Sequence, residues 1–283
     1  SFRAIPMLMF DHFGGYNTIL GLMSSGSTIV SVDDRTVDTV CAAVEKHEVA
    51  LLPATPSFLA LLLASNAQHT YDLSTLTRIT YGTEMMPEAL LKRVADAFPG
   101  VLLQQTYGLS EVGVLSSKSE SNDSTWVRVG GNGYETKVVD GILWIKSDYS
   151  MLGYIGVEDE GSDNDGWFNT QDRVEVKGEY FRFLGRDSDI INVGGQKVMP
   201  GEVESCLLEM PAIKAARVSA EPHALLGEVV HAEVVLDTAE GTVDRRVIRK
   251  FCKERMPSFK VPQHIEILDE IPLTKRLKKQ RRG

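Results

Sequence analysis

Apolar positions in the first hundred residues follow alternating helical and strand periodicities. Residues 36–47 place Val37, Val40, Cys41 and Val44 at helical spacing, which predicts an amphipathic helix. Further helices are predicted at 18–25, 56–65 and 87–97, and strands at 27–32, 49–53, 79–81 and 101–105. Thr55 precedes Pro56 at the start of one of these helices and is expected to be its N-cap. This βαβα order predicts a parallel sheet covered by helices.

The pattern changes twice further along the chain. Short strands dominate the middle, at 136–139, 142–146, 174–176 and 180–184, with polar loops expected at 116–125 and 158–166. After Gly201 the pattern predicts helices at 202–209 and 243–255 and strands at 212–220, 231–236 and 263–267. The predicted fold class is therefore mixed: an α/β part at 1–115 with a β-rich subdomain at 116–185, then a small α+β domain at 186–283.

Charge and cysteine content exclude several classes of protein. The formal net charge of −9 over 283 residues argues against general nucleic-acid binding and against adhesion to anionic membranes. The most apolar stretch, 49–64, contains Pro53 and Pro56 and is too short to span a bilayer. The three cysteines, at positions 41, 206 and 252, are too far apart in sequence to suggest a disulfide framework or a zinc site. A cytoplasmic location is expected.

Two polar segments follow predicted strands, where ligands bind in parallel sheets. Gly108, Ser110 and Glu111 combine a close backbone approach with a hydroxyl and a carboxylate, which suits a phosphate and its Mg²⁺. Gly82, Thr83 and Glu84 follow the strand at 79–81 and would present backbone amides to a planar ligand. Taken alone, each segment is typical of an ordinary turn.

Other candidate groups are scattered along the chain. Asp172 lies in a turn-rich region, where its carboxylate could accept hydrogen bonds from both hydroxyls of a ribose. His12 precedes a pair of glycines, and a second glycine pair lies in the stretch 183–198, which runs Phe-Leu-Gly-Arg-Asp-Ser-Asp-Ile-Ile-Asn-Val-Gly-Gly-Gln-Lys-Val. A lysine near the basic C-terminus follows Pro-Leu-Thr and could neutralise developing phosphate charge.

In this order, the segments 104–111, 141–154, 166–172 and 183–204 resemble the adenylate-forming superfamily. That superfamily includes acyl- and aryl-CoA synthetases, nonribosomal-peptide adenylation domains and luciferases. The stretches Asp-Gly-Ile-Leu-Trp-Ile at 140–145, Met-Leu-Gly-Tyr at 151–154 and Val-Gly-Gly-Gln-Lys-Val at 193–198 look most like the acyl-CoA synthetase branch.

The resemblance implies a role for each matching residue. Tyr107 and the backbone of Gly82, Thr83 and Glu84 would frame adenine, with Gly108 in the same segment. Ser110 would touch the α-phosphate, Glu111 would bind Mg²⁺, and Asp172 would hold the ribose beside Arg186. Asp189 would be the hinge of a mobile C-terminal domain. His12, Gly14 and Gly15 would line the carboxylate pocket, Lys278 would serve adenylation, and Gly194, Gly195 and Lys197 would lie on the loop that faces the thiol. Lys275 and Lys279 are neighbouring alternatives to Lys278.

The implied reaction has two steps and uses ATP and Mg²⁺. A small-molecule carboxylic acid attacks the α-phosphorus of ATP to give an acyl- or aryl-adenylate, and a thiol of CoA or of phosphopantetheine then displaces AMP. A second hypothesis is an adenylation domain that loads an acyl carrier protein without a CoA step, with Asp11 holding an amine. A third is a non-catalytic fragment that binds nucleotide weakly or serves as an interaction module.

Two departures from the family pattern bear on these hypotheses. The Ser/Thr/Gly-rich phosphate loop of the family is absent from the sequence, so the chain is expected to be the C-terminal portion of a longer protein and to have an incomplete large domain. Gln171 stands where the family usually has glycine, directly before Asp172.

Overall fold

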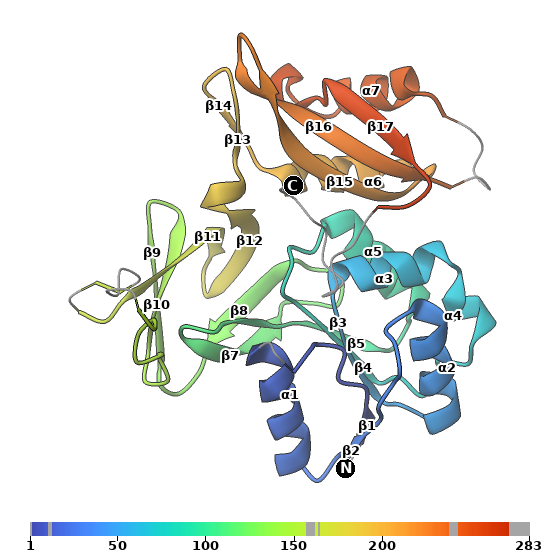
Figure 1. Ribbon diagram of the computed structural model, residues 1–283, viewed down its shortest axis with the longest axis vertical. Helices are drawn as coiled ribbons and strands as arrows, with labels where there is room; N and C mark the ends of the chain where they lie inside the picture. Colours follow the sequence, from blue (N-terminus) through green and yellow to red (C-terminus); the bar gives the residue numbers. More distant parts are fainter. Residues whose placement is uncertain (1, 11–12, 157–161, 164, 238–242, 272–283) are drawn as a thin grey trace.

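The computed structural model describes residues 2–10, 13–156, 162–163, 165–237 and 243–271. Its described strands form three sheets that follow one another along the chain (Figure 1). The mixed α/β and α+β fold class predicted from the sequence is confirmed.

The first sheet is parallel and has the strand order β2-β1-β3-β4-β5. Its strands are β1 (Arg3–Ala4), β2 (Thr28–Ile29), β3 (Leu51–Ala54), β4 (Arg78–Tyr81) and β5 (Leu102–Gln105). The connecting helices are α1 (Phe13–Ser24), α2 (Val37–His47), α3 (Pro56–Ala64), α4 (Ala67–Thr70) and α5 (Glu88–Ala97). Thr55 caps α3 as predicted, because its side chain accepts a hydrogen bond from the Phe58 amide.

The second sheet is antiparallel and has the order β6-β7-β8-β12-β11-β10-β9. Its strands are β6 (Tyr107–Leu109), β7 (Gly113–Ser119), β8 (Trp126–Gly130), β9 (Tyr134–Val139), β10 (Ile142–Ser147), β11 (Phe168–Lys177) and β12 (Tyr180–Arg186). The expected loop at 116–125 is wrong in its first part, since Ser116 to Ser119 pair with β8. Their polar side chains hid a strand that is held by backbone hydrogen bonds.

The third sheet belongs to the C-terminal unit and has the order β14-β13-β16-β15, with β17 parallel to β16. The unit contains β13 (Ile191–Val193), β14 (Gln196–Val198), β15 (Ile213–His223), β16 (Gly227–Leu236), β17 (His264–Leu268), α6 (Pro200–Leu208) and α7 (Arg245–Lys253). Short 3₁₀ turns lie at Asp187–Asp189 and Ser258–Lys260. The sequence boundaries expected at 115 and 186 fall within β7 and at the last residue of β12.

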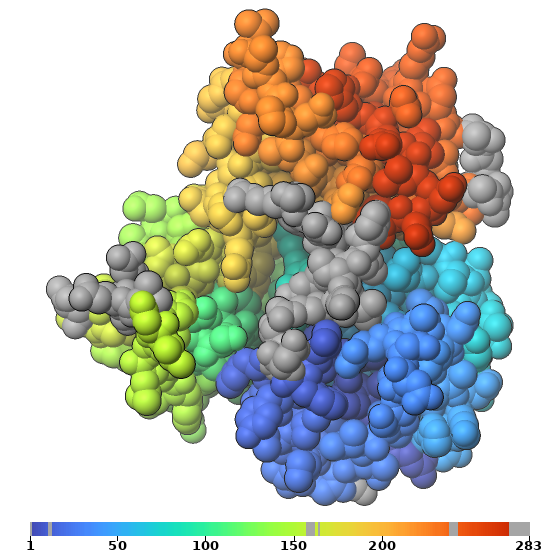
Figure 2. Space-filling model, viewed as in Figure 1, coloured from blue at the N-terminus to red at the C-terminus, as the bar shows by residue number. Residues whose placement is uncertain are grey.

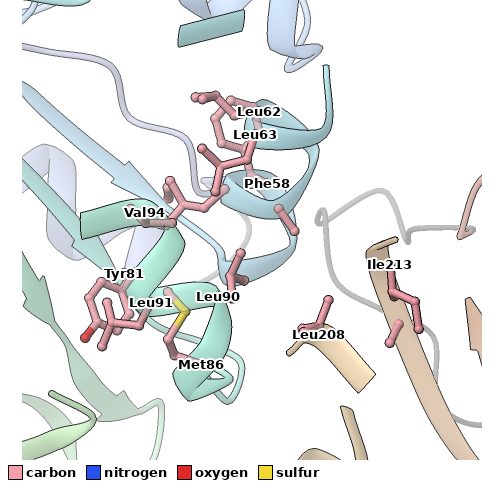
Figure 3. Packing of buried hydrophobic residues seen from close by; sticks show 14 of the residues in the cluster. Phe58, Leu62, Leu63, Tyr81, Met86, Leu90, Leu91, Val94, Leu208 and Ile213 are labelled. Atoms are coloured by element: carbon pink, nitrogen blue, oxygen red, sulfur yellow. The ribbon is translucent and has the colours of Figure 1, made fainter. Parts of the chain in front are cut away.

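The C-terminal unit packs on the helices of the parallel sheet. One cluster of buried apolar residues includes members of both, and Figure 3 shows Leu208 and Ile213 of this unit across from Leu90 of α5. Lys214 donates a 3.2 Å hydrogen bond to the carbonyl of Ala64, the last residue of α3. The space-filling view shows the C-terminal part lying above the N-terminal and β-rich parts (Figure 2).

Within the ranges described above, no helix is long and apolar enough to cross a membrane.

Candidate functional site

A cavity of about 280 Å³ lies where the three sheets come together. The ends of β4 and β5, the first turn of α3, strands β6, β11 and β12, and the C-terminal unit all contribute to its walls. Seven residues singled out from the sequence line it: Thr83, Glu84, Tyr107, Gly108, Asp172, Arg186 and Asp189.

Asp172 is the centre of the polar wall. The phenol of Tyr107 donates a 2.6 Å hydrogen bond to its Oδ2, and Arg186 Nε lies 3.5 Å from its Oδ1. Register explains the second contact, because Asp172 of β11 and Arg186 of β12 are direct partners in the antiparallel ladder. A carboxylate held in this way can accept hydrogen bonds from two vicinal hydroxyls.

Burial shifts the pKa of both members of this pair. Burial raises the pKa of Asp172, against the Tyr107 hydrogen bond and the Arg186 charge, which lower it. Burial likewise raises the pKa of Tyr107 well above its ordinary value, and the Asp172 charge adds to the effect. Tyr107 therefore remains a neutral donor at physiological pH.

The backbone before Asp172 is constrained. Gln171 has φ of 58°, in the left-handed region that glycine adopts most readily. This conformation gives a physical reason for glycine at that position in the family pattern. The sequence predicted a turn-rich region here, but Gln171 and Asp172 lie within strand β11, where the Thr170 hydroxyl accepts a 3.1 Å hydrogen bond from the Asp172 amide.

Thr83 and Glu84, which follow β4, also line the cavity. A Cβ at Gly82 would overlap Thr106, so only glycine allows the ends of β4 and β5 to approach this closely. Thr83 has φ of 68°, which is strained for a β-branched residue. The Glu84 carboxylate accepts a 3.0 Å hydrogen bond from the Ser57 amide in the first turn of α3.

Sequence reasoning gave no role to several lining residues, among them Phe183, Gln105 and Ser57. Phe183 stacks on Tyr107 with ring centroids 4.3 Å apart and thereby orients the phenol. Gln105, at the end of β5, and Ser57, in the first turn of α3, are buried polar residues that also line the cavity. Gln105 could have been found as a polar side chain ending an apolar strand. Phe183 begins the 183–198 stretch, but the resemblance assigns it no role, and nothing local marks Ser57.

Ser110 and Glu111 follow β6 in the turn before β7. Tyr154 donates a 3.1 Å hydrogen bond to Glu111 Oε1. Among the described residues there is no cluster of three or more His, Cys, Asp or Glu side chains that could hold a metal ion. A single carboxylate nevertheless fits Mg²⁺, which is usually bound through one or two carboxylates together with substrate phosphates.

Several other expected site residues do not line the cavity. Gly14 and Gly15 lie in the first turn of α1, where a Cβ at Gly15 would overlap the Met9 carbonyl. Gly194 and Gly195 form the β13–β14 turn at φ of 56° and 85°, and Lys197 is exposed on β14. His12, Asp11, Lys275, Lys278 and Lys279 lie outside the described residues.

Comparison with known proteins identifies relatives of this chain. The chain is 28% identical to an indoleacetate–CoA ligase of Aromatoleum aromaticum, over 96% of this chain and 56% of the relative. It is also 28% identical to a 2-succinylbenzoate–CoA ligase of Bacillus subtilis, over 99% of this chain and 60% of the relative. The chain thus spans little more than half the length of these relatives.

A crystal structure of an anthranilate CoA ligase in complex with anthranoyl-AMP superimposes with a TM-score of 0.84. The two are 25% identical, and the match covers 99% of this chain and 58% of the other. Family models match as well: that of AMP-binding enzymes at residues 3–155, and that of their C-terminal domain at 202–278. Because the first of these models matches more than half of its length, this chain belongs to the AMP-binding enzyme family.

Proposed function

We propose that this chain forms the base- and ribose-binding part of an ATP-dependent acid–thiol ligase. The observation that carries the proposal is the partly buried Asp172 carboxylate, which lies between Tyr107 and Arg186 in the cavity where the three sheets meet. Asp172 would accept hydrogen bonds from the ribose hydroxyls, and Tyr107 would offer an aromatic face to the base. The named relatives are CoA ligases, which supports this reaction class.

The remaining roles extend the same proposal. Glu111 would hold Mg²⁺, which supplies charge stabilisation at the α-phosphate, and Ser110 would bind that phosphate. Lys278 would neutralise charge in the adenylation step, and His12 would line the acid pocket beside Gly14 and Gly15. Asp189, in the 3₁₀ turn between the units, would be the hinge that carries Gly194, Gly195 and Lys197 to the thiol.

A small carboxylic acid and CoA are the proposed substrates, and the phosphopantetheine thiol of an acyl carrier protein is the alternative acceptor. CoA is the favoured acceptor because both named relatives are CoA ligases. We also propose a cytoplasmic location, since all three cysteines are free and buried.

Carboxylate-dependent ATP–pyrophosphate exchange tests the ligase proposal. The assay should be run on this chain and on a form extended upstream, with a panel of aliphatic and aromatic acids. Exchange by either form supports the proposal, and trapping with CoA or with a carrier identifies the acceptor. Absence of exchange from both forms, together with absence of AMP binding, contradicts it.

The assigned lysine has its own test. Lys278→Ala should slow adenylate formation and leave thioester formation from a preformed acyl-adenylate unchanged. An unchanged first step would show that another lysine, such as Lys275 or Lys279, has this role.

A further inference from the structure

The first turn of α3 forms a polar corner of the cavity that no role above uses. Ser57 lies in this turn and lines the cavity, although only 3% of its surface is exposed. Its Oγ forms no hydrogen bond with any group in the described part of the chain. A buried hydroxyl without a partner costs free energy, so its retention in a cavity wall calls for an explanation.

The backbone donors of this turn are already engaged. Pro56 has no amide hydrogen, Phe58 donates to Thr55 Oγ1 at 3.1 Å, and Ser57 donates to Glu84 Oε2 at 3.0 Å. The Glu84 carboxylate therefore compensates the partial positive charge at the N-terminus of α3. Because a negative charge already lies there, this corner does not favour an anionic ligand. A hydroxyl beside a carboxylate favours a hydrogen-bond donor.

The neighbouring walls suit a flat group. Pro56, Ala60 and Leu90 of the helices, together with Leu208, Ala215 and Ala216 of the C-terminal unit, supply apolar surface. Tyr107, stacked on Phe183, supplies an aromatic face to the same cavity. A planar ring that carries an amino group meets both requirements.

We infer that Ser57 Oγ, next to the Glu84 carboxylate, accepts a hydrogen bond from the exocyclic amino group of the bound base. This inference rests on the proposed nucleotide function and assigns the residue that reads the base. Adenine has a donor at that position, whereas hypoxanthine has a carbonyl oxygen that would face the Glu84 carboxylate. The corner thus selects adenine through one matched hydrogen bond and one repulsive contact.

Binding of two nucleotides by the full 283-residue chain tests the inference. The probes are AMP and purine ribonucleoside monophosphate, which differ only in the amino group. Calorimetric titration should show tighter binding of AMP to the wild type. In Ser57→Ala, the advantage of AMP over the purine nucleotide should shrink by about three- to tenfold, the range expected for one neutral hydrogen bond. Affinity for the purine nucleotide should not change, which shows that the variant is folded.

Ser65→Ala is the matched control, because Ser65 ends the same helix and its hydroxyl donates to the Leu62 carbonyl. This variant should keep the full preference for AMP. An equal preference in Ser57→Ala and wild type overturns the role of Ser57 and leaves the proposed function standing. Failure of the wild type to bind either nucleotide overturns the inference, and together with absence of exchange from both forms it also overturns the proposed function. IMP provides a second readout, since Glu84→Gln should narrow the difference between AMP and IMP.

Discussion

The phenol of Tyr107 donates a 2.6 Å hydrogen bond to the carboxylate of Asp172, 65 residues further along the chain. Tyr107 lies on β6 at one edge of the antiparallel sheet and Asp172 on β11, so the bond connects two strands that are not neighbours in the sheet, within one wall of the cavity. Because it stabilises the ionised carboxylate, this bond offsets part of the cost of burying Asp172.

Removing the phenol should therefore weaken nucleotide binding and shift its pH dependence. Tyr107→Phe leaves the ring stacked on Phe183 but deletes a hydrogen bond to a charged group, worth about 1.5–3 kcal/mol. AMP affinity should fall about tenfold or more. As the pH is lowered, AMP binding by the variant should weaken at a higher pH than binding by the wild type, because the pKa of Asp172 rises further in the variant. Titrations of AMP binding between about pH 4 and 8 measure both effects.

Tyr134→Phe is the control for that experiment. Its hydroxyl donates to the Val114 carbonyl within the same sheet but does not line the cavity. An identical pH profile for Tyr107→Phe and Tyr134→Phe would show that the Tyr107–Asp172 bond has no part in binding.

Asp172→Asn should change fold stability and AMP affinity in opposite directions. Burial raises the pKa of Asp172, so the folded state holds this proton more tightly than the unfolded state. The carboxyl consequently favours folding at pH values below its ordinary pKa of 3.8, and this contribution is lost as the pH rises through the raised pKa of the folded state. At pH 7 the neutral amide should raise the urea midpoint and lower AMP affinity. A reduced midpoint at pH 7 would contradict the proposed cost of burying the charge.

Gln171→Gly should stabilise the fold. The φ of 58° at Gln171 costs a non-glycine residue about 1–2 kcal/mol, more than the backbone entropy that glycine loses on folding, about 0.5–1 kcal/mol. The expected net gain in the free energy of unfolding is about 0.5–1 kcal/mol, measured by urea denaturation. Gln196→Gly is the control, because Gln196 lies in strand β14 and glycine should destabilise it there.

Gly201→Ala should loosen the junction between the C-terminal unit and the large domain. A Cβ at Gly201 in α6 would overlap the terminal methyl of Met85, which lies between β4 and α5. Alanine favours helix by about 1 kcal/mol over glycine, so a loss cannot come from α6 itself. Limited proteolysis should show faster cleavage between the two units.

The double variant Met85→Ala, Gly201→Ala should restore the cleavage rate, because it removes the overlapping methyl. Gly21→Ala is the matched helical control, since a Cβ there meets nothing within 4 Å. Equal cleavage of Gly201→Ala and wild type would show that Met85 moves aside without weakening the junction.

Local patterns predicted most elements within a few residues. The helix at 36–47, the Thr55 cap and the alternation of strands and helices in the parallel sheet depend on neighbouring side chains and on backbone capping. Strand β6 was expected to be a turn, because three residues with a central glycine have no periodicity, and only pairing with β7 makes them a strand.

Some residues of the candidate site were predictable from local sequence and others were not. Thr83, Glu84, Tyr107, Asp172 and Arg186 were selected from short segments and all reach one cavity. Ser57 and Phe183 were not selected, since a serine after proline and a phenylalanine in a strand are common. Their importance comes from Glu84 and Tyr107, which lie distant in sequence and adjacent in space.

By itself, the sequence determined the order of elements, the family pattern and the residue types available for binding a nucleotide, because periodicity, capping and glycine conformations act over a few residues. Only the tertiary structure decided that Tyr107 meets Asp172, that Glu84 faces the first turn of α3, and that Gly194 and Gly195 lie away from the cavity. These contacts depend on sheet order, strand register and the packing of the C-terminal unit, which are set by burial of surfaces far apart along the chain.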